Sequence, residues 1–113
     1  MAVTQAAVEG LLEPLRAIRP ITSRKMFGGV GVYCDGVFFA CIDDDRLYFK
    51  ADELTLPMFE TYGAEQWEIE GQSGGPMPYW EVPSAILADS EALGGWIDAA
   101  VGVANRKKKP KKR

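Results

Sequence analysis

The dipeptide Asp35-Gly36 is the strongest constraint on what this chain can fold into. A type I′ turn needs positive φ at both central residues, and Asp-Gly supplies this between two segments of alternating apolar residues. A two-residue turn here pairs Cys34 with Val37. We therefore expect an antiparallel hairpin with one apolar face on the core. Its further expected pairs are Val32–Phe39 and Val30–Cys41.

The hairpin extends into a predicted three-stranded meander over residues 24–50. Three consecutive aspartates, residues 43–45, mark the second turn, since aspartate tolerates the left-handed conformation better than most residues. We expect all three to form the loop. The pairs are then Cys41–Leu47 and Phe39–Phe49, with Arg46, Tyr48 and Lys50 on the opposite face.

Three segments have the apolar periodicity of helices. The first covers residues 4–18, and the second, residues 53–62, is short. The third covers residues 90–104 and has Asp89 as its N-cap. Within it, Gly94-Gly95 lowers the intrinsic helix stability by about 1 kcal/mol per glycine relative to alanine, unless the pair permits close packing on a partner.

Two further strands complete the predicted fold. Residues 66–70 alternate apolar and polar side chains, and residues 77–82 form an edge strand because Pro76 and Pro78 cannot donate to a ladder. The element order is then α-β-β-β-α-β-β-α, which is an α+β domain with one antiparallel sheet.

The charges of the chain divide into an acidic body and a basic tail. Residues 1–105 hold six Lys and Arg against sixteen Asp and Glu, a net formal charge of −10, and residues 106–113 hold seven cations and no acid. The tail attracts phosphates or the acidic body of another copy. We expect one folded domain over residues 1–105 and a tail disordered by self-repulsion. The nucleic-acid candidates are Arg106, Lys107, Lys108, Lys109, Lys111, Lys112 and Arg113.

The composition excludes the common catalytic sites. The chain has no histidine and two cysteines, Cys34 and Cys41, without a CxxC motif, so a Cys–His nucleophile and a Ser–His–Asp triad are impossible. In the expected register the thiols lie about 13 Å apart along the strands, too far for a disulfide. We expect no metal, no cofactor and no catalytic residue. Reduced thiols and the lack of about 20 consecutive apolar residues indicate a cytoplasmic protein without membrane contact.

Several separated motifs follow one another in the order typical of a known family. They are Arg24, Met26-Phe27-Gly28-Gly29, Gly31, Tyr33, Asp35-Gly36-Val37, Phe39-Ala40, Leu47-Tyr48-Phe49-Lys50-Ala51-Asp52, Phe59, Tyr79-Trp80-Glu81-Val82-Pro83 and a helix with Trp96. Across about residues 5–103 the chain resembles the TfoX N-terminal domain family, the first half of the TfoX/Sxy competence regulators.

The resemblance implies a two-layer α/β fold with one antiparallel sheet, similar to the secretion-chaperone-like fold, and a bacterial origin. It also implies regulation of competence genes through protein partners, and it supplies no catalytic residue. The full regulators continue into a second, helical C-terminal domain, whereas here the basic tail follows. We therefore expect a stand-alone N-terminal domain.

The glycine-rich segment from Met26 to Gly31 is the most distinctive local feature. It leads into a strand, whereas phosphate-binding glycine loops lead into a helix. Its glycines allow a bulge or close packing in the first strand, or the segment forms a partner-binding edge. The aromatic pair Tyr79-Trp80 either packs in the sheet or anchors a partner. The partner-binding candidates are Arg24, Lys25, Met26, Phe27, Gly28, Gly29, Tyr79 and Trp80.

Two classes of function remain, with an enzyme of unfamiliar type as a third. The first is a non-enzymatic regulatory protein-interaction domain, linked to competence or transcription regulation. It forms a homodimer through a sheet edge or through a sheet face with Tyr33, Phe38 and Tyr48. The alternative is a non-specific nucleic-acid-binding accessory protein that acts through the basic C-terminal tail. An enzyme would show a deep, closed pocket with convergent polar groups.

Overall fold

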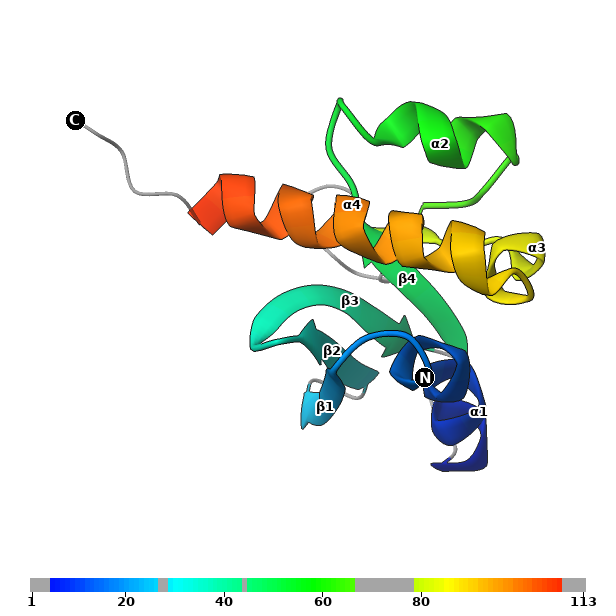
Figure 1. The fold of residues 1–113 in the computed structure, drawn as a ribbon, viewed down its shortest axis with the longest axis vertical. Helices are drawn as coiled ribbons and strands as arrows, with labels where there is room; N and C mark the ends of the chain where they lie inside the picture. Colours follow the sequence, from blue (N-terminus) through cyan, green and yellow to red (C-terminus); the bar gives the residue numbers. More distant parts are fainter. Residues whose placement is uncertain (1–4, 27–28, 44, 67–78, 109–113) are drawn as a thin grey trace, which may run out of the picture.

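The computed structural model describes residues 5–26, 29–43, 45–66 and 79–108 (Figure 1). Helix α1 (Gln5–Arg16) precedes four consecutive strands, β1 (Ile21–Met26), β2 (Gly29–Cys34), β3 (Val37–Asp43) and β4 (Arg46–Lys50). After them come α2 (Leu56–Thr61), β5 (Tyr79–Glu81), α3 (Ser84–Leu87) and α4 (Ser90–Lys108).

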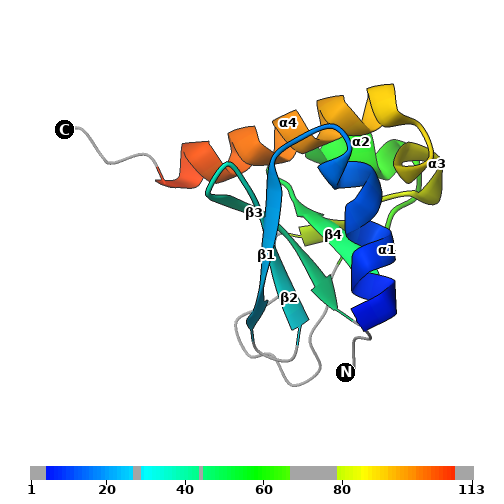
Figure 2. The same ribbon diagram turned by 60° about the horizontal axis from the view of Figure 1, so that its bottom comes forward.

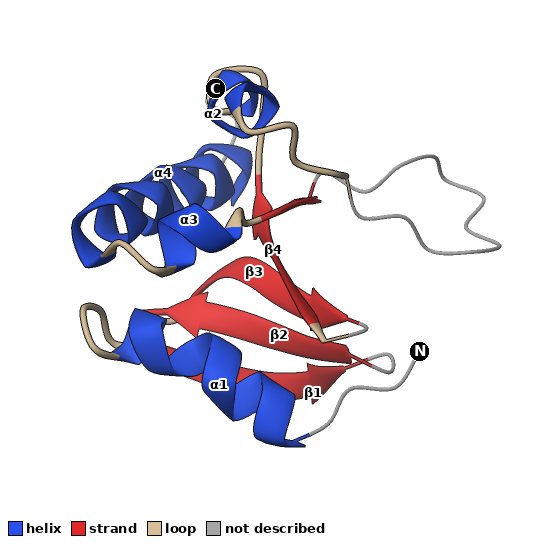
Figure 3. Cartoon of the chain, turned by 90° about the vertical axis from the view of Figure 1, so that its right-hand side faces the viewer, coloured by secondary structure: helices blue, strands red, loops and turns tan. Residues whose placement is uncertain are grey.

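The strands form one antiparallel sheet in the order β1-β2-β3-β4-β5. Helix α4 packs on β3 and β4, and α1 packs on β1. Figure 2 shows α4 lying across the strands and α1 running alongside them, and Figure 3 shows α3 beside α4. The predicted α+β class with one antiparallel sheet is confirmed. None of the described helices has the length and apolar character needed to cross a membrane.

One main core lies between the helices and the inner face of the sheet. Its largest fully buried side chains include Phe39 and Phe49, whose ring centroids are 5.2 Å apart. Phe59 of α2 meets Trp96 of α4 edge to face at 4.7 Å, which joins the short helix to the same core. A smaller cluster of Cys41, Tyr48 and Tyr79 is separate from this core.

The predicted hairpin at Asp35-Gly36 is confirmed. Asp35 has φ 53° and Gly36 has φ 84°, the positive values that the turn requires, and Cys34 pairs with Val37. Aspartate therefore accepts the left-handed conformation here that its glycine neighbour adopts without strain.

The pairing beyond this turn differs from the prediction because β3 contains a bulge. Tyr33 pairs with Phe38 but Val32 pairs with Ala40, so Phe39 is an extra residue without a partner on β2. The predicted pairs Val32–Phe39 and Val30–Cys41 are therefore wrong. Both Phe39 and Ala40 are fully buried in the main core, and Cys41 is turned to the opposite face.

The second turn is tighter than predicted. Asp43 pairs with Arg46, and Asp45 has φ 60°. The expected loop of three aspartates and the pairs Cys41–Leu47 and Phe39–Phe49 are wrong, because the tighter turn shifts the pairing of β4 with β3 by one residue. The observed pairs are Cys41–Tyr48 and Ala40–Phe49, and Leu47 and Phe49 still face the main core as predicted.

The meander has four strands where three were predicted. Met26 pairs with Gly29, so the chain reverses inside the glycine-rich segment and does not continue as one bulged strand. Strand β1 is thereby an edge of the sheet. Phe27 and Gly28 lie outside the described residues.

Of the later elements, α2, β5 and α4 have the predicted type but not the predicted length, and the short helix α3 was not predicted. The N-cap is confirmed, since Asp89 Oδ1 accepts a hydrogen bond from the Ala92 N–H at 3.2 Å. Helix α4 continues to Lys108, through three residues that we expected to be disordered. Strand β5 is an edge strand as predicted. Of the predicted strand 66–70 only Gln66 is described, and it forms an isolated bridge with Trp80.

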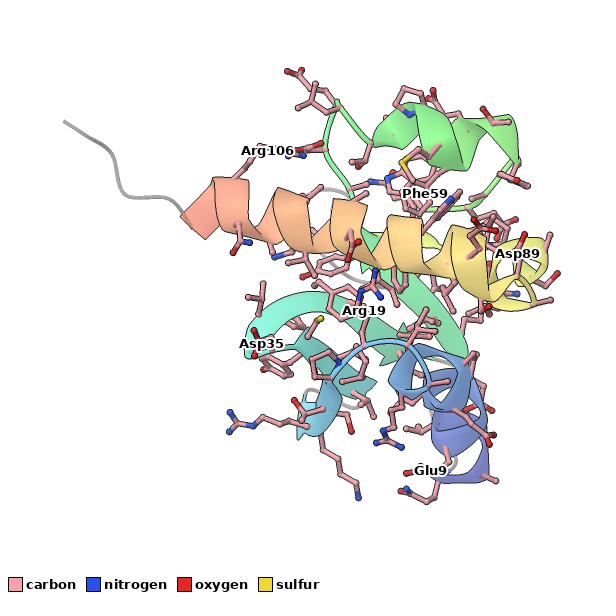
Figure 4. All side chains as sticks on the ribbon, viewed as in Figure 1. Glu9, Arg19, Asp35, Phe59, Asp89 and Arg106 are labelled. Carbon is pink, nitrogen blue, oxygen red and sulfur yellow. The ribbon has the colours of Figure 1, made fainter. Side chains whose placement is uncertain are left out.

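Arg19 ties the end of the first helical segment to the middle of α4 (Figure 4). Its Nε and Nη2 donate to the two carboxylate oxygens of Asp98 at 3.0 and 2.8 Å, and its Nη1 donates to the Ile18 carbonyl at 2.8 Å. A Cβ on Gly94 would lie 3.2 Å from Arg19 Nη2. Gly94 therefore permits the approach of an arginine of its own chain, and it needs no outside partner to explain it.

Asp52 fixes the C-terminal end of α4. Its Oδ2 accepts hydrogen bonds from Arg106 Nη2 at 2.7 Å and Nε at 2.9 Å, and its Oδ1 accepts from the N–H groups of Leu54 and Thr55. Partial burial alone would raise the pKa of Asp52, but the hydrogen bonds from Arg106, Leu54 and Thr55 outweigh it and hold that pKa below its ordinary value.

We predict that alanine at the two neighbouring glycines of α4 changes the free energy of unfolding by different amounts. Gly95→Ala stabilises the fold by about 0.5–1 kcal/mol, because alanine is the better helix former and its Cβ meets no atom within 4 Å. Gly94→Ala gains less, because its Cβ displaces the guanidinium of Arg19. Urea denaturation of both variants measures the difference, and equal gains would contradict this role of Gly94.

We also predict that Asp52 stabilises the fold through both charge and caps. Asp52→Ala lowers the free energy of unfolding by about 1 kcal/mol at pH 7. Asp52→Asn lowers it less, because it keeps a side-chain oxygen that accepts from the Leu54 and Thr55 N–H groups. Because the folded pKa of Asp52 lies below its ordinary 3.8, the ionic contribution is present above about pH 4 and lost as the pH falls through the folded pKa. The gap between wild type and Asp52→Asn in denaturation curves should therefore shrink on acidification.

Candidate functional site

An open cleft of about 520 Å³ lies where α1, α3, the start of β4 and the segment between α2 and β5 meet. Chain reversal at Asp45 brings Arg46 and Leu47 into this cleft, and the hydrogen bond from the Val82 N–H to the Leu47 carbonyl at 3.0 Å fixes its far wall. The apolar lining residues are Leu11, Leu47, Tyr62, Ala64, Val82, Pro83 and Leu87.

Arg46 stands between two carboxylates in the cleft. Its Nη1 lies 3.5 Å from Glu65 Oε1 and 3.6 Å from Glu81 Oε1. The charge of Glu81, then a hydrogen bond with Tyr48, raises the pKa of Arg46, so the guanidinium stays charged. The Glu81 N–H donates to the Glu65 carbonyl at 2.8 Å, which keeps the two glutamates side by side.

This arrangement suits binding of a polypeptide segment. Apolar side chains can dock on the floor of the cleft, formed by Leu11, Leu47 and Leu87. The charged residues at its rim, Arg46, Glu65 and Glu81, select the charge of the ligand. Among the described residues no group of three or more His, Cys, Asp or Glu could hold a metal ion. None of the cleft residues was singled out from the sequence as a site, because they come from five separated segments and carry no common motif.

A row of aromatic side chains lies on the sheet face that bears Cys41. Phe38 stacks at 5.2 Å from Tyr33 and 6.1 Å from Tyr79, and Lys50 Nζ lies 5.2 Å from the centroid of Phe38. Tyr33 and Phe38 are partly exposed, as the predicted dimer face requires. Tyr48, the third residue of that prediction, is only 6% exposed and therefore adds little surface.

The structure separates the predicted partner-binding residues into two groups. Arg24, Lys25 and Met26 end β1, and Gly29 begins β2. Tyr79 and Trp80 lie in β5 at the opposite edge of the sheet, with three strands between β1 and β5, so the two groups do not form one site. Arg24 and Lys25 are exposed, and charged side chains on an edge strand commonly prevent pairing with another sheet.

The predicted nucleic-acid residues also divide. Arg106 is engaged by Asp52 and is therefore less available for phosphate. Lys107 and Lys108 belong to α4. Lys109, Lys111, Lys112 and Arg113 lie outside the described residues.

The two thiols lie in different clusters. Cys34 is buried in the main core and Cys41 in the smaller cluster with Tyr48 and Tyr79, and both are free. Burial, with a smaller effect of the Asp43 charge, raises the pKa of Cys41 to about 12. Burial also raises the pKa of Cys34.

We predict that neither thiol reacts with a thiolate-selective reagent in the native protein at about pH 8, because the protonated thiol is not the nucleophile. Both should react when the chain is unfolded in denaturant. A spectrophotometric thiol assay with and without denaturant provides the measurement. Fast labelling of Cys41 in the native protein would show that its surroundings open readily.

The comparison with known proteins agrees with the motifs that span this fold. No curated protein matches the chain. The model of the TfoX N-terminal domain family matches residues 13–104, which covers most of the chain and runs from within α1 to within α4. The chain therefore belongs to the TfoX N-terminal domain family.

Proposed function

We propose that this chain is a non-enzymatic, regulatory protein-interaction domain of the bacterial cytoplasm that acts in the control of competence or transcription. Membership of the TfoX N-terminal domain family supports a regulatory role. The observation that carries the proposal is the cleft between α1, β4 and α3, with its apolar floor and charged rim.

The floor of the cleft offers anchoring positions for a protein partner. Leu11, Leu47 and Leu87 come from α1, β4 and α3, so an inserted side chain would contact three elements at once. Binding energy at protein interfaces concentrates in a few such apolar anchors, and the surrounding charges govern specificity and rate of association. A cleft of about 520 Å³ accommodates several side chains of a peptide.

The available side chains support binding over catalysis. The sequence has no histidine, and both thiols are buried with raised pKa values. The glutamates of the cleft are paired with Arg46 at its rim, an arrangement suited to charge selection more than to proton transfer.

Nucleic-acid binding through the tail stays the alternative prediction. The acidic body, with its net formal charge of −10 over residues 1–105, would repel the phosphate backbone, and Arg106 is held by Asp52. Affinity for an oligonucleotide that falls steeply with salt and disappears when the tail cations are replaced would favour this alternative.

The proposal is tested with a matched pair of leucine variants. Leu87→Asp places a charge on the cleft floor, and Leu54→Asp places the same charge at an exposed position outside the cleft, where Leu54 is 68% exposed. We expect Leu87→Asp to weaken retention of the protein partner at least about tenfold, the usual cost of losing an anchor. Leu54→Asp should retain it.

Capture is performed from nuclease-treated bacterial lysate with each full-length chain, followed by quantification of every retained protein. Circular dichroism first establishes that both variants fold. Equal retention by wild type, Leu87→Asp and Leu54→Asp would exclude the cleft as the partner site.

A further inference from the structure

The cleft has a surplus of negative charge. Of the described residues that line it, Asp45, Glu65 and Glu81 are acidic and Arg46 is basic. A single nitrogen of Arg46 serves both glutamates at 3.5 and 3.6 Å, longer than the roughly 2.7–2.9 Å of a strong charge-assisted hydrogen bond. Glu65 is 76% exposed in its side chain. The cleft can therefore take further cations on its carboxylates.

The same chain carries a segment with the complementary chemistry. The residues after α4 read Lys109-Pro110-Lys111-Lys112-Arg113, four cations and one proline. Lysine and arginine stems pack on apolar surface while their charged ends reach carboxylates. Such a segment would place its stems on the leucine floor and its charges on Glu65 and Glu81.

This segment cannot reach the cleft of its own molecule. The cleft is lined by Ser84 and Leu87 of α3, which leads directly into the first turn of α4, and the basic residues follow the last turn. Figure 1 shows these two ends of α4 at opposite sides of the molecule. Helix α4 separates them by about 27 Å at 1.5 Å per residue. Residues 109–113, fully extended, span at most about 18 Å.

We propose that the basic segment 109–113 of one copy binds in the acidic cleft of a second copy of this chain. The inference rests on the proposed role of the cleft as a protein-binding site and names its occupant. If two copies place their α4 helices antiparallel, the basic segment of each emerges beside the cleft of the other. Both contacts then form in one symmetric pair.

The first experiment measures self-association of the full chain by sedimentation equilibrium at about 0.05 M and about 0.5 M salt, because screening weakens exposed ion pairs. The tail variant replaces Lys109, Lys111, Lys112 and Arg113 by Gln, the cleft variant carries Glu65→Gln and Glu81→Gln, and the control carries Glu53→Gln and Glu60→Gln. The two control glutamates are exposed and do not line the cleft.

We expect wild type and control to dimerise at low salt. The tail variant and the cleft variant should each dimerise at least about tenfold more weakly, since each loses charge pairs in both contacts. A wild type that stays monomeric at low salt, or a tail variant that dimerises like wild type, would overturn the proposal. Weakening by the tail variant but not by the cleft variant would also overturn it, because the segment would then bind elsewhere.

Mixing the two variants tests whether the contact joins two molecules. The cleft variant keeps its basic segment and the tail variant keeps its cleft, so one complementary contact forms only in the mixture. Fluorescence anisotropy should show tighter association in the mixture than in either variant alone, and equal affinities would contradict the proposal.

A synthetic peptide of residues 107–113 identifies the surface that it binds. Added to the isotope-labelled tail variant, it should shift the amide resonances of Arg46, Glu65 and Glu81, and shifts confined to other residues would overturn the proposal. If the peptide does not shift these resonances but Leu87→Asp loses an outside partner, the cleft remains a protein-binding site with another occupant. If Leu87→Asp also retains every partner, both the proposed function of the cleft and the proposed occupant are excluded.

Discussion

A single unpaired residue in the sheet determines where the later side chains point. Because Phe39 has no partner on β2, both Phe39 and Ala40 enter the main core, and Cys41 turns to the opposite face. The bulge also puts Ile42 on the inner face, and the tight turn at Asp45 pairs Ile42 with Leu47, so that Leu47 lies on the same face. Arg46, the residue before it, lines the cleft. The position of these cleft residues thus depends on the turn at Asp45 and on a bulge in the preceding strand.

Two arginines outside the core add to the packing of Leu93, Ile97 and Ala100 in fixing the position of α4. Arg19 holds Asp98 in the middle of the helix, and Arg106 near its end holds Asp52. In both pairs the guanidinium donates two hydrogen bonds to the carboxylate, so orientation as well as charge is specified. Asp52 also accepts from the backbone before α2, so one carboxylate joins the loop after β4 to the C-terminal helix.

The sequence was sufficient where local chemistry decides the structure. The Asp35-Gly36 turn, the N-cap at Asp89 and the apolar stripe of α4 each depend on neighbouring residues, and all three predictions are confirmed. The bulge at Phe39 was not predictable in this way, because its cause is the fit of two side chains into a core formed by distant helices. The cleft was missed for the same reason, since its floor assembles from α1, β4 and α3.

Helix α4 is held at two separate points by ion pairs. Arg19 binds it at its middle and Arg106 binds Asp52 from near its end, so a shift of the helix along its axis would break both pairs. Binding of a molecule beside α3 is therefore not expected to change the C-terminal end of α4 by moving this helix. The two ends then act as independent binding sites. A partner that binds both gains affinity through effective concentration, while the intrinsic affinity of each site stays unchanged.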